Sequence, residues 1–378
     1  MKEEGSSDTA KEIEHQPELW LKTFSVIAER QKELEIFLSN ALKHENIRVV
    51  LIGAGTSAYI GEVLQNYMGR KFKRATEAIA STDFISHPKD FITNKKEPIL
   101  LISFARSGDS PESLASIDLA SQFCATLFQL VITCNPSGKL AEQAGGKNSF
   151  VLLMPEEAND KGLAMTGSFT SMLLAGLLLC DLDNLDQNKV YVNQLAHYGS
   201  LILEKYAKNI KEVANLEFNR VIFLGSGLLK GIARESQLKV QELSDGQVVC
   251  KYDSFLGVRH GPKAVIKNST VIVYLFSSDA YVNKYEYDLV KSINDQKEKL
   301  YEIGIGETIK DNKNISLNLT IQVATSNQIP EAYFALCAVL PGQMLGLYKS
   351  INLGLHPDSP SVNNSINRVV QGVNIYKL

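Results

Sequence analysis

Charged side chains at helical spacing stand out in the segment 235–262. Glu235, Lys239 and Glu242 follow one another at i, i+4 and i+7, a spacing that stacks three ionisable groups on one face of a helix. The sequence RHGP follows a polar loop and places two turn-forming residues directly behind the titratable imidazole of His260. Such groups can move protons on a small polar substrate. A solvated helix face with an ordinary i, i+4 ion pair is the alternative interpretation.

Two hydroxyl-rich loops in the first half of the chain could hold a phosphate. The loop GAGTSA at 53–58 follows an apolar run and opens a helix, whose positive end and backbone N–H groups favour an anion. The loop SFARSGDSPES at 103–113 also ends a strand pattern before a helix. Serines at such positions can also be simple helix N-caps. The hydroxyl residues considered for binding are Thr56, Ser57, Ser103, Ser107 and Ser110.

The first loop also fits the dinucleotide pattern G-x-G-x-x-A, with Glu77 roughly 20 residues further on. A nicotinamide-dependent oxidoreductase is therefore a competing class. Two hydroxyl-rich loops at adjacent strand ends suit one compact phosphate better than a pyrophosphate and a ribose. We therefore favour a phosphate-monoester site and expect no cofactor.

The elements that would position these groups are short apolar runs separated by longer amphipathic segments. The runs in the first half are VVLIGAG, PILLISF, LVITCN and FVLLMPE, which indicates a parallel sheet covered by helices on both faces. The second half repeats the plan with VIFLGSG, TVIVYLFSS, LYEIGIGE and LTIQVATS, and Gly225 lies 172 residues after Gly53. Two copies of one α/β domain explain this repeat.

The repeat predicts five regions along the chain. They are an N-terminal helical segment at 1–45, a first domain at 46–185, a connecting helix at 186–217, a second domain at 218–349 and a tail at 350–378 that completes the active site.

Composition narrows the classes of function. The 378 residues are 44% hydrophobic with a formal net charge of −3, so we expect a globular protein without a nucleic-acid partner. We find neither a signal peptide nor ~20 consecutive apolar residues, so we expect no membrane segment. The five cysteines form no C-x-x-C pair. We therefore expect no disulfide, no metal site and a cytoplasmic location.

In these motifs the chain resembles the sugar isomerase (SIS) domain family, over roughly residues 17–378. The matching segments, in order, are GTS at 55–57, ARSGDS at 105–110, AMTGSFT at 164–170, ESQLKVQE at 235–242 and RHGP at 259–262. The ending NRVVQGVNIY is similar to the branch described as tagatose-6-phosphate ketose/aldose isomerase or galactosamine-6-phosphate deaminase. The resemblance implies tandem, mainly parallel five-stranded sheets flanked by helices.

The resemblance also implies a binding site for a sugar 6-phosphate. Ser57, Ser107 and Ser110, with Thr56 nearby, would hold the phosphate. Related isomerases have serine where this chain has Ala105, so one hydroxyl contact is missing or comes from elsewhere, with Ser103 as a candidate.

By the same resemblance, Glu242 would be the base that moves a proton between C1 and C2, and His260 would open the sugar ring. Lys239 and Arg368 would stabilise developing negative charge, and Glu235 would orient Lys239 or bind hydroxyls. Arg368 departs from the lysine of related isomerases, and an arginine is not expected to form an imine.

The expected activity is conversion of D-galactosamine 6-phosphate to D-tagatose 6-phosphate and ammonia in amino-sugar catabolism. Alternatives are a ketose/aldose isomerase of tagatose 6-phosphate or glucosamine 6-phosphate without amine loss, and a non-catalytic sugar-phosphate sensor. The segment before the first sheet is too short for a glutaminase domain, so we do not expect a synthase. We expect a homodimer or larger assembly, in which His260 serves its own or a neighbouring subunit.

Overall fold

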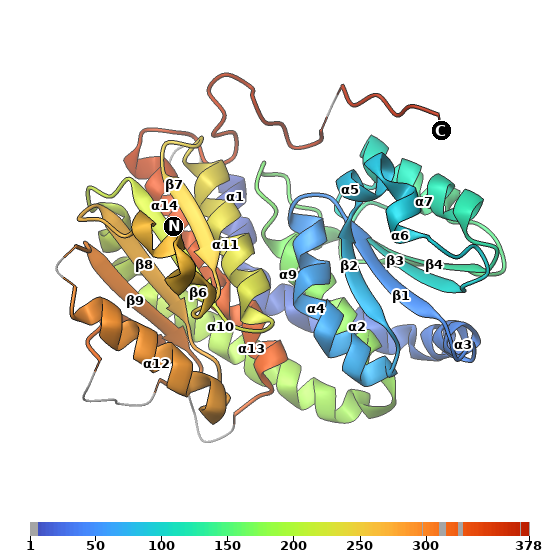
Figure 1. The fold of residues 1–378 in the computed structure, drawn as a ribbon, viewed down its shortest axis with the longest axis horizontal. Coiled ribbons are helices and arrows are strands. Elements are labelled where there is room, and N and C mark those ends of the chain that lie inside the picture. The colour runs from blue at the N-terminus through green and yellow to red at the C-terminus, as the bar shows by residue number, and fades with distance from the viewer. Residues whose placement is uncertain (1–6, 297, 310–314, 324–327, 371, 378) are drawn as a thin grey trace. The chain divides into compact units, whose positions relative to one another are not determined.

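The computed structural model describes residues 7–296, 298–309, 315–323, 328–370 and 372–377 (Figure 1). The chain divides into two compact units. The first-sheet unit takes the described parts of 18–160, 165–192 and 366–378, and the second-sheet unit those of 1–17, 161–164 and 193–365. The predicted region limits differ from these units in detail and stay a proposal.

The first-sheet unit is built on five parallel strands in the order β2-β1-β3-β4-β5. The strands are β1 (Arg48–Gly53), β2 (Thr76–Ala80), β3 (Ile99–Ala105), β4 (Leu127–Thr133) and β5 (Ser149–Leu153). Every residue of β3 is buried, as expected for the central strand of a sheet covered on both faces.

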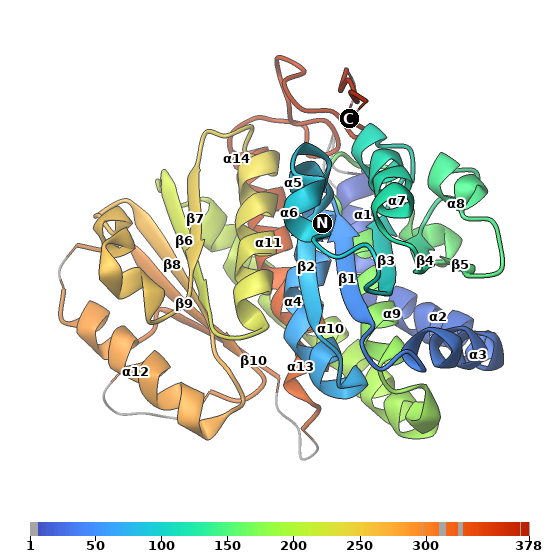
Figure 2. The same ribbon diagram turned by 45° about the vertical axis from the view of Figure 1, so that its right-hand side comes forward.

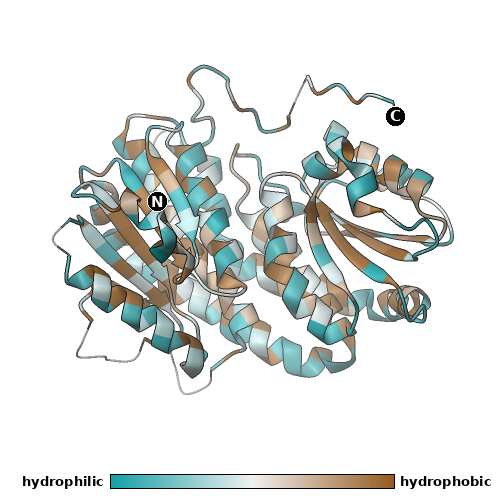
Figure 3. Ribbon diagram, viewed as in Figure 1, coloured by the Kyte–Doolittle hydropathy of each residue, from teal (hydrophilic) through white to brown (hydrophobic). Residues whose placement is uncertain are grey.

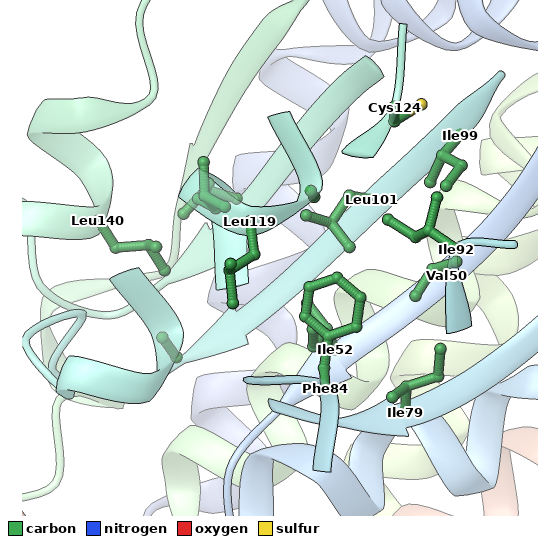
Figure 4. Close-up of a cluster of buried hydrophobic side chains, with 14 residues drawn as sticks. Val50, Ile52, Ile79, Phe84, Ile92, Ile99, Leu101, Leu119, Cys124 and Leu140 are labelled. Carbon is green, nitrogen blue, oxygen red and sulfur yellow. The ribbon is translucent and has the colours of Figure 1, made fainter. Parts of the chain in front are cut away.

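Helices cover both faces of this sheet (Figure 2). One face packs its Val, Ile and Leu side chains against α5 (Ser81–Ser86), α6 (Pro88–Phe91), α7 (Pro111–Phe123) and α8 (Lys139–Gln143), and Figure 4 shows this core around Phe84 and Leu101. The remaining helices of this unit are α2 (Gln16–Glu29), whose first two residues fall in the other unit, α3 (Gln31–Leu42), α4 (Thr56–Phe72) and α9 (Gly167–Leu179), with 3-10 turns at Glu156–Ala158 and Leu182–Asn184.

The second-sheet unit repeats this topology with five parallel strands in the order β10-β9-β8-β6-β7. The strands are β6 (Arg220–Gly225), β7 (Val249–Asp253), β8 (Thr270–Leu275), β9 (Tyr301–Gly306) and β10 (Leu319–Gln322). In both sheets, the first strand of the copy lies between the second and the third. The predicted duplication of one α/β domain is confirmed.

In the second-sheet unit, helices at the surface have one polar and one apolar face, whereas buried helices are mostly apolar (Figure 3). They are α1 (Ser7–Glu14), α11 (Leu229–Leu243), α12 (Ala280–Asn294), α13 (Glu331–Ala338), α14 (Leu340–Asn352) and most of the long α10 (Leu185–Ala214), with 3-10 turns at Gly257–His260 and Pro262–Val265. Within the described residues, Glu331–Asn352 is long and apolar enough to cross a membrane, but 94% of its apolar window is buried inside the protein. These helices are therefore part of the core.

Eight of the ten strands coincide with the apolar runs found in the sequence, and β2 and β7 are the two that those runs did not locate. Both are edge strands with few fully buried residues. The predicted strand at 319–326 ends at Gln322, and its residues 324–326 lie outside the described residues. The described part of the N-terminal segment is helical, as predicted, but is divided into α1, α2 and α3.

Candidate active site

The three charged residues at helical spacing lie on α11, which follows β6 in the second-sheet unit. The Nζ atom of Lys239 is 2.7 Å from Glu242 Oε2 and 3.3 Å from Glu235 Oε1. The side chains of Glu235 and Lys239 are fully buried, whereas that of Glu242 is 23% exposed. The arrangement is therefore not a solvated surface pair. Of the three side chains, only that of Glu242 is reached by solvent.

Close helix packing holds this cluster in place. Glycines 342 and 346 of α14 let the two helices approach, because a Cβ atom at Gly342 would lie 2.6 Å from Ser236 Cβ. A Cβ atom at Gly346 would lie 2.9 Å from the backbone oxygen of Lys239. The backbone that carries the cation is thus packed directly against α14.

The charge state of Lys239 follows from its surroundings. Burial lowers the pKa of Lys239, but the nearby carboxylates of Glu235 and Glu242 outweigh it, so that the pKa is raised above its ordinary value. Lys239 is therefore a cation at neutral pH and cannot act as a neutral amine. Its positive charge lies 2.7 Å from Glu242 Oε2, beside the carboxylate that is the candidate base.

The structure places His260 at the end of the 3-10 turn Gly257–His260, between β7 and β8. Its side chain is exposed, and Gly261 has a φ of 119°, a left-handed conformation that favours glycine. Among the described residues of this unit, no hydrogen bond or ion pair joins His260 to Glu242. The sequence correctly indicated a turn here, and the imidazole of His260 is exposed at its end.

The two hydroxyl-rich loops lie at the carboxyl ends of β1 and β3, which are neighbours in the first sheet. Gly55 has a φ of 56°, and a Cβ atom at Gly53 would lie 2.6 Å from the backbone of Ser57, so the first loop is tightly wound. Ser110 stands at the N-cap position of α7, yet its side chain makes no capping hydrogen bond. Its hydroxyl instead lies 2.6 Å from Ser113 Oγ. The simple N-cap interpretation therefore does not describe Ser110.

A cavity of about 100 Å³ lies between these loops. Its polar lining residues are Ser57, Arg106, Ser107, Ser110, Ser113 and Arg368. Thr56 and Ser103 are buried close by but lie outside this lining. Since ligand pockets for larger molecules enclose about 300–1,000 Å³, this cavity suits a compact tetrahedral anion and does not suit a dinucleotide.

The tail forms one wall of this cavity through a set of hydrogen bonds. Arg368 donates from Nε to the carbonyl oxygen of Asp160 at 2.9 Å and from Nη2 to Asn159 Oδ1 at 2.9 Å. Arg106 in turn donates from Nη2 to the carbonyl oxygen of Arg368. The structure thus brings Arg368 together with Ser57, Ser107 and Ser110 in the lining of one cavity.

Asp160 is a further residue that positions this site. Its buried carboxylate accepts the backbone N–H groups of Thr166, Gly167 and Ser168 at 2.8, 3.1 and 2.9 Å, which caps the N-terminus of α9. The loop that it closes carries Met165, whose sulfur lies 3.9 Å from Ser57 Oγ. Sequence reasoning missed Asp160.

Arg106, Ser113 and Met165 line the cavity and were also missed as site residues. The signal for Arg106 was an arginine inside the motif ARSGDS, and the signal for Ser113 was its position three residues after Ser110. No comparable signal marks Met165, which comes from a distant loop.

The corresponding loop of the second sheet is arranged differently. Ser278 donates its backbone N–H to the Glu331 carboxylate at 2.7 Å, and the Ser277 hydroxyl donates to the same oxygen. Two further carboxylates, Glu286 and Glu307, are buried near the ends of these strands. Acidic side chains therefore stand beside the loop of the second copy, where the first copy has serines and arginines.

Comparison with known proteins assigns the chain to a protein family. The SIS domain model matches residues 41–181, which contain the first sheet and both hydroxyl-rich loops. Relatives more than 30% identical extend the match over nearly the whole chain. The chain therefore belongs to the SIS domain family, as its motifs predicted.

Individual relatives indicate which branch of this family the chain is similar to. The chain is 36% identical to D-galactosamine-6-phosphate deaminase AgaS of Escherichia coli, over 97% of this chain and 95% of that protein. It is 38% identical to the AgaS deaminase of Shewanella sp. strain ANA-3, over 98% of this chain and 92% of that one. The crystal structure of tagatose-6-phosphate ketose/aldose isomerase from Escherichia coli matches with a TM-score of 0.90 and 34% identity, over 98% and 96% of the two chains.

Proposed function

We propose that the protein is an enzyme that converts D-galactosamine 6-phosphate to D-tagatose 6-phosphate and ammonia. The observation that carries this proposal is the similarity to AgaS deaminases at 36–38% identity over nearly the full chain. The Glu235–Lys239–Glu242 cluster supports it, because the reaction needs a carboxylate that can exchange protons with the substrate, and Glu242 is 23% exposed.

In the proposed mechanism, Glu242 removes the proton from C2 of the open-chain amino sugar. The electron pair of the broken C–H bond forms the C1–C2 double bond while the π pair of the C1 carbonyl moves to O1, which takes up a proton to give an enolamine. Glu242 then returns the proton to C1, which gives an imine at C2. Water adds to this imine, and the C–N bond breaks to release ammonia and the ketose. Lys239 stabilises the negative charge that develops, Glu235 holds Lys239, and His260 opens the sugar ring, in its own or a neighbouring subunit.

The substrate's 6-phosphate is proposed to occupy the cavity of the first-sheet unit. Ser57, Ser107 and Ser110 line that cavity and would donate hydrogen bonds to the phosphate oxygens. Thr56 and Ser103 are proposed to support the two loops from their buried positions. Arg368 completes the wall with the tail.

A second candidate is aldose/ketose isomerisation without loss of the amine, favoured by the similarity to the Escherichia coli tagatose-6-phosphate isomerase structure. The same carboxylate would move a proton between C1 and C2 of a sugar that carries a hydroxyl at C2. The dinucleotide-dependent oxidoreductase is disfavoured by the size of the cavity.

The proposal is tested by measuring ammonia and ketose release from galactosamine 6-phosphate and glucosamine 6-phosphate, and aldose formation from tagatose 6-phosphate. We expect ammonia from galactosamine 6-phosphate and a loss of about 10²–10⁴-fold in kcat for Glu242→Gln, the usual contribution of a general base. Glu204→Gln, on the exposed face of α10, is the matched control. No ammonia and no ketose from galactosamine 6-phosphate would overturn the substrate, and a fully active Glu242→Gln would overturn the base.

We also propose a homodimer or larger assembly that acts in the cytoplasm. The five cysteines are free, which fits a reducing compartment. Sedimentation equilibrium of the active enzyme tests the assembly, and an active monomer would contradict it.

A further inference from the structure

The lining of the cavity in the first-sheet unit includes Ala105, at a position where the resemblance implies a serine. Ala105 ends β3, and its side chain, which belongs to the apolar core cluster, has no hydrogen-bond donor. Ser103, the hydroxyl that could compensate, lies two residues earlier in β3, is 4% exposed and is outside the lining. A side-chain donor at this part of the lining would therefore have to come from another residue.

Arg106 directly follows Ala105 and lines the same cavity. The residue is 6% exposed, so its guanidinium is held inside the protein, where a charge is costly unless acceptors or an anion compensate it. Its Nη2 donates to the carbonyl oxygen of Arg368. A guanidinium has five N–H donors in a planar fork and can serve more than one acceptor.

Arg368 lines the cavity as well, but its guanidinium donates hydrogen bonds to the loop before α9. Nε and Nη2 donate to the carbonyl oxygen of Asp160 and to Asn159 Oδ1, which ties the tail to the loop before α9. Arg368 thereby forms the wall, and its own carbonyl oxygen receives the bond from Arg106. Arg106 stands between Ala105 and Ser107 in the lining of the cavity, and its position in this loop is the reason to consider it as an anion ligand.

We propose that Arg106 is a direct ligand of the substrate's phosphate and takes over the hydrogen bond that Ala105 cannot make. A phosphate monoester carries a charge of about −1.5 to −2 at pH 7, and the serine hydroxyls of the cavity are neutral donors. A guanidinium matches two phosphate oxygens at once and supplies the opposite charge. The inference rests on the proposed function for the identity of the ligand as a sugar 6-phosphate.

Direct titration with inorganic phosphate tests this proposal without turnover. Calorimetry on the wild type, Arg106→Gln, Arg106→Lys and the double variant Ala105→Ser/Arg106→Gln would give the four dissociation constants. We expect Arg106→Gln to bind phosphate at least tenfold more weakly and Arg106→Lys to lose less. The double variant should regain part of the affinity, because it restores a hydroxyl at the wall. Arg70→Gln, at the exposed end of α4, should bind like the wild type.

Steady-state kinetics separates a ligand from a residue that only secures the tail. A phosphate ligand predicts a KM for galactosamine 6-phosphate that rises by at least tenfold in Arg106→Gln, with kcat within about threefold. Phosphate affinity like that of the wild type in both Arg106→Gln and Arg106→Lys would overturn the proposal and leave Arg106 as an anchor of the tail. If Arg106→Gln does not fold, the affinity of Arg106→Lys decides: a weaker affinity than the wild type supports the proposal, and an equal affinity overturns it.

The two proposals fail in different ways. A wild type that releases no ammonia, but whose phosphate affinity depends on Arg106, overturns the proposed function alone. A wild type that deaminates galactosamine 6-phosphate, and whose phosphate affinity is indifferent to Arg106, overturns the role of Arg106 alone.

Discussion

Replacing Glu286 by glutamine should change how the stability of the protein depends on pH. Glu286 lies on α12 and is fully buried, and its Oε2 accepts the Ser277 N–H at 3.1 Å and Asn283 Nδ2 at 3.0 Å. Burial raises the pKa of Glu286 from an ordinary 4.5 to about 7, with a smaller contribution from the Glu331 charge, although the hydrogen bonds act in the opposite direction. The folded protein therefore binds this proton more tightly than the unfolded chain does.

The sign and size of the effect follow from that difference. The stabilisation from protonated Glu286 is complete below pH 4.5 and is lost as the pH rises through about 7. Since one pKa unit corresponds to about 1.4 kcal/mol, the gap between the two values corresponds to about 3 kcal/mol. Burial also raises the pKa values of Glu302 and Glu307, which add to the slope of the wild type in the same direction.

Urea unfolding at pH 5, 6, 7 and 8 measures this contribution. We expect the wild type to lose stability between pH 5 and pH 8, and Glu286→Gln to lose up to about 3 kcal/mol less, because glutamine does not titrate. Glu204→Gln, which is exposed, should follow the wild type. If the difference in unfolding free energy between wild type and Glu286→Gln is the same at pH 5 and pH 8, the reasoning about Glu286 is wrong.

Two substitutions in and beside the charged cluster of α11 test its packing and charge. Lys239→Met leaves the fully buried Glu235 without its cation and should destabilise the protein by about 3–5 kcal/mol in urea unfolding; stability equal to the wild type would refute the ion pairing. Gly342→Ala places a Cβ atom 2.6 Å from Ser236 Cβ and should cost about 1–3 kcal/mol. Gly145→Ala, where a Cβ atom meets no neighbour within 4 Å, is the control, and equal effects of the two would contradict the close approach of α11 and α14.

The sequence was most informative where structure depends on near neighbours along the chain. The spacing of Glu235, Lys239 and Glu242 was enough to predict one cluster, because a helix brings i, i+4 and i+7 together whatever surrounds it. Apolar runs likewise located the inner strands of both sheets and the edge strands β5 and β10. The edge strands β2 (TEAIA) and β7 (VCKYD) escaped because charged residues interrupt their short apolar sequences.

Residues whose partners are distant in sequence could not be assigned in this way. Arg106 and Arg368 are 262 positions apart, and only the fold shows that one binds the backbone of the other. The cap that Asp160 provides for α9 needs a loop conformation that no short motif specifies. The burial of Lys239 depends on the glycines of α14, more than a hundred residues further along the chain.

The Glu331 carboxylate beside the second sheet bears on the stoichiometry of ligand binding. It already accepts the hydroxyl of Ser277 and the backbone N–H of Ser278, in the loop that corresponds to the proposed phosphate loop of the first copy. A negative side chain that satisfies these donors repels a second anion. In the second copy, a carboxylate of the protein therefore takes the hydrogen bonds that an anion would otherwise receive. A phosphate titration should saturate at one equivalent per chain.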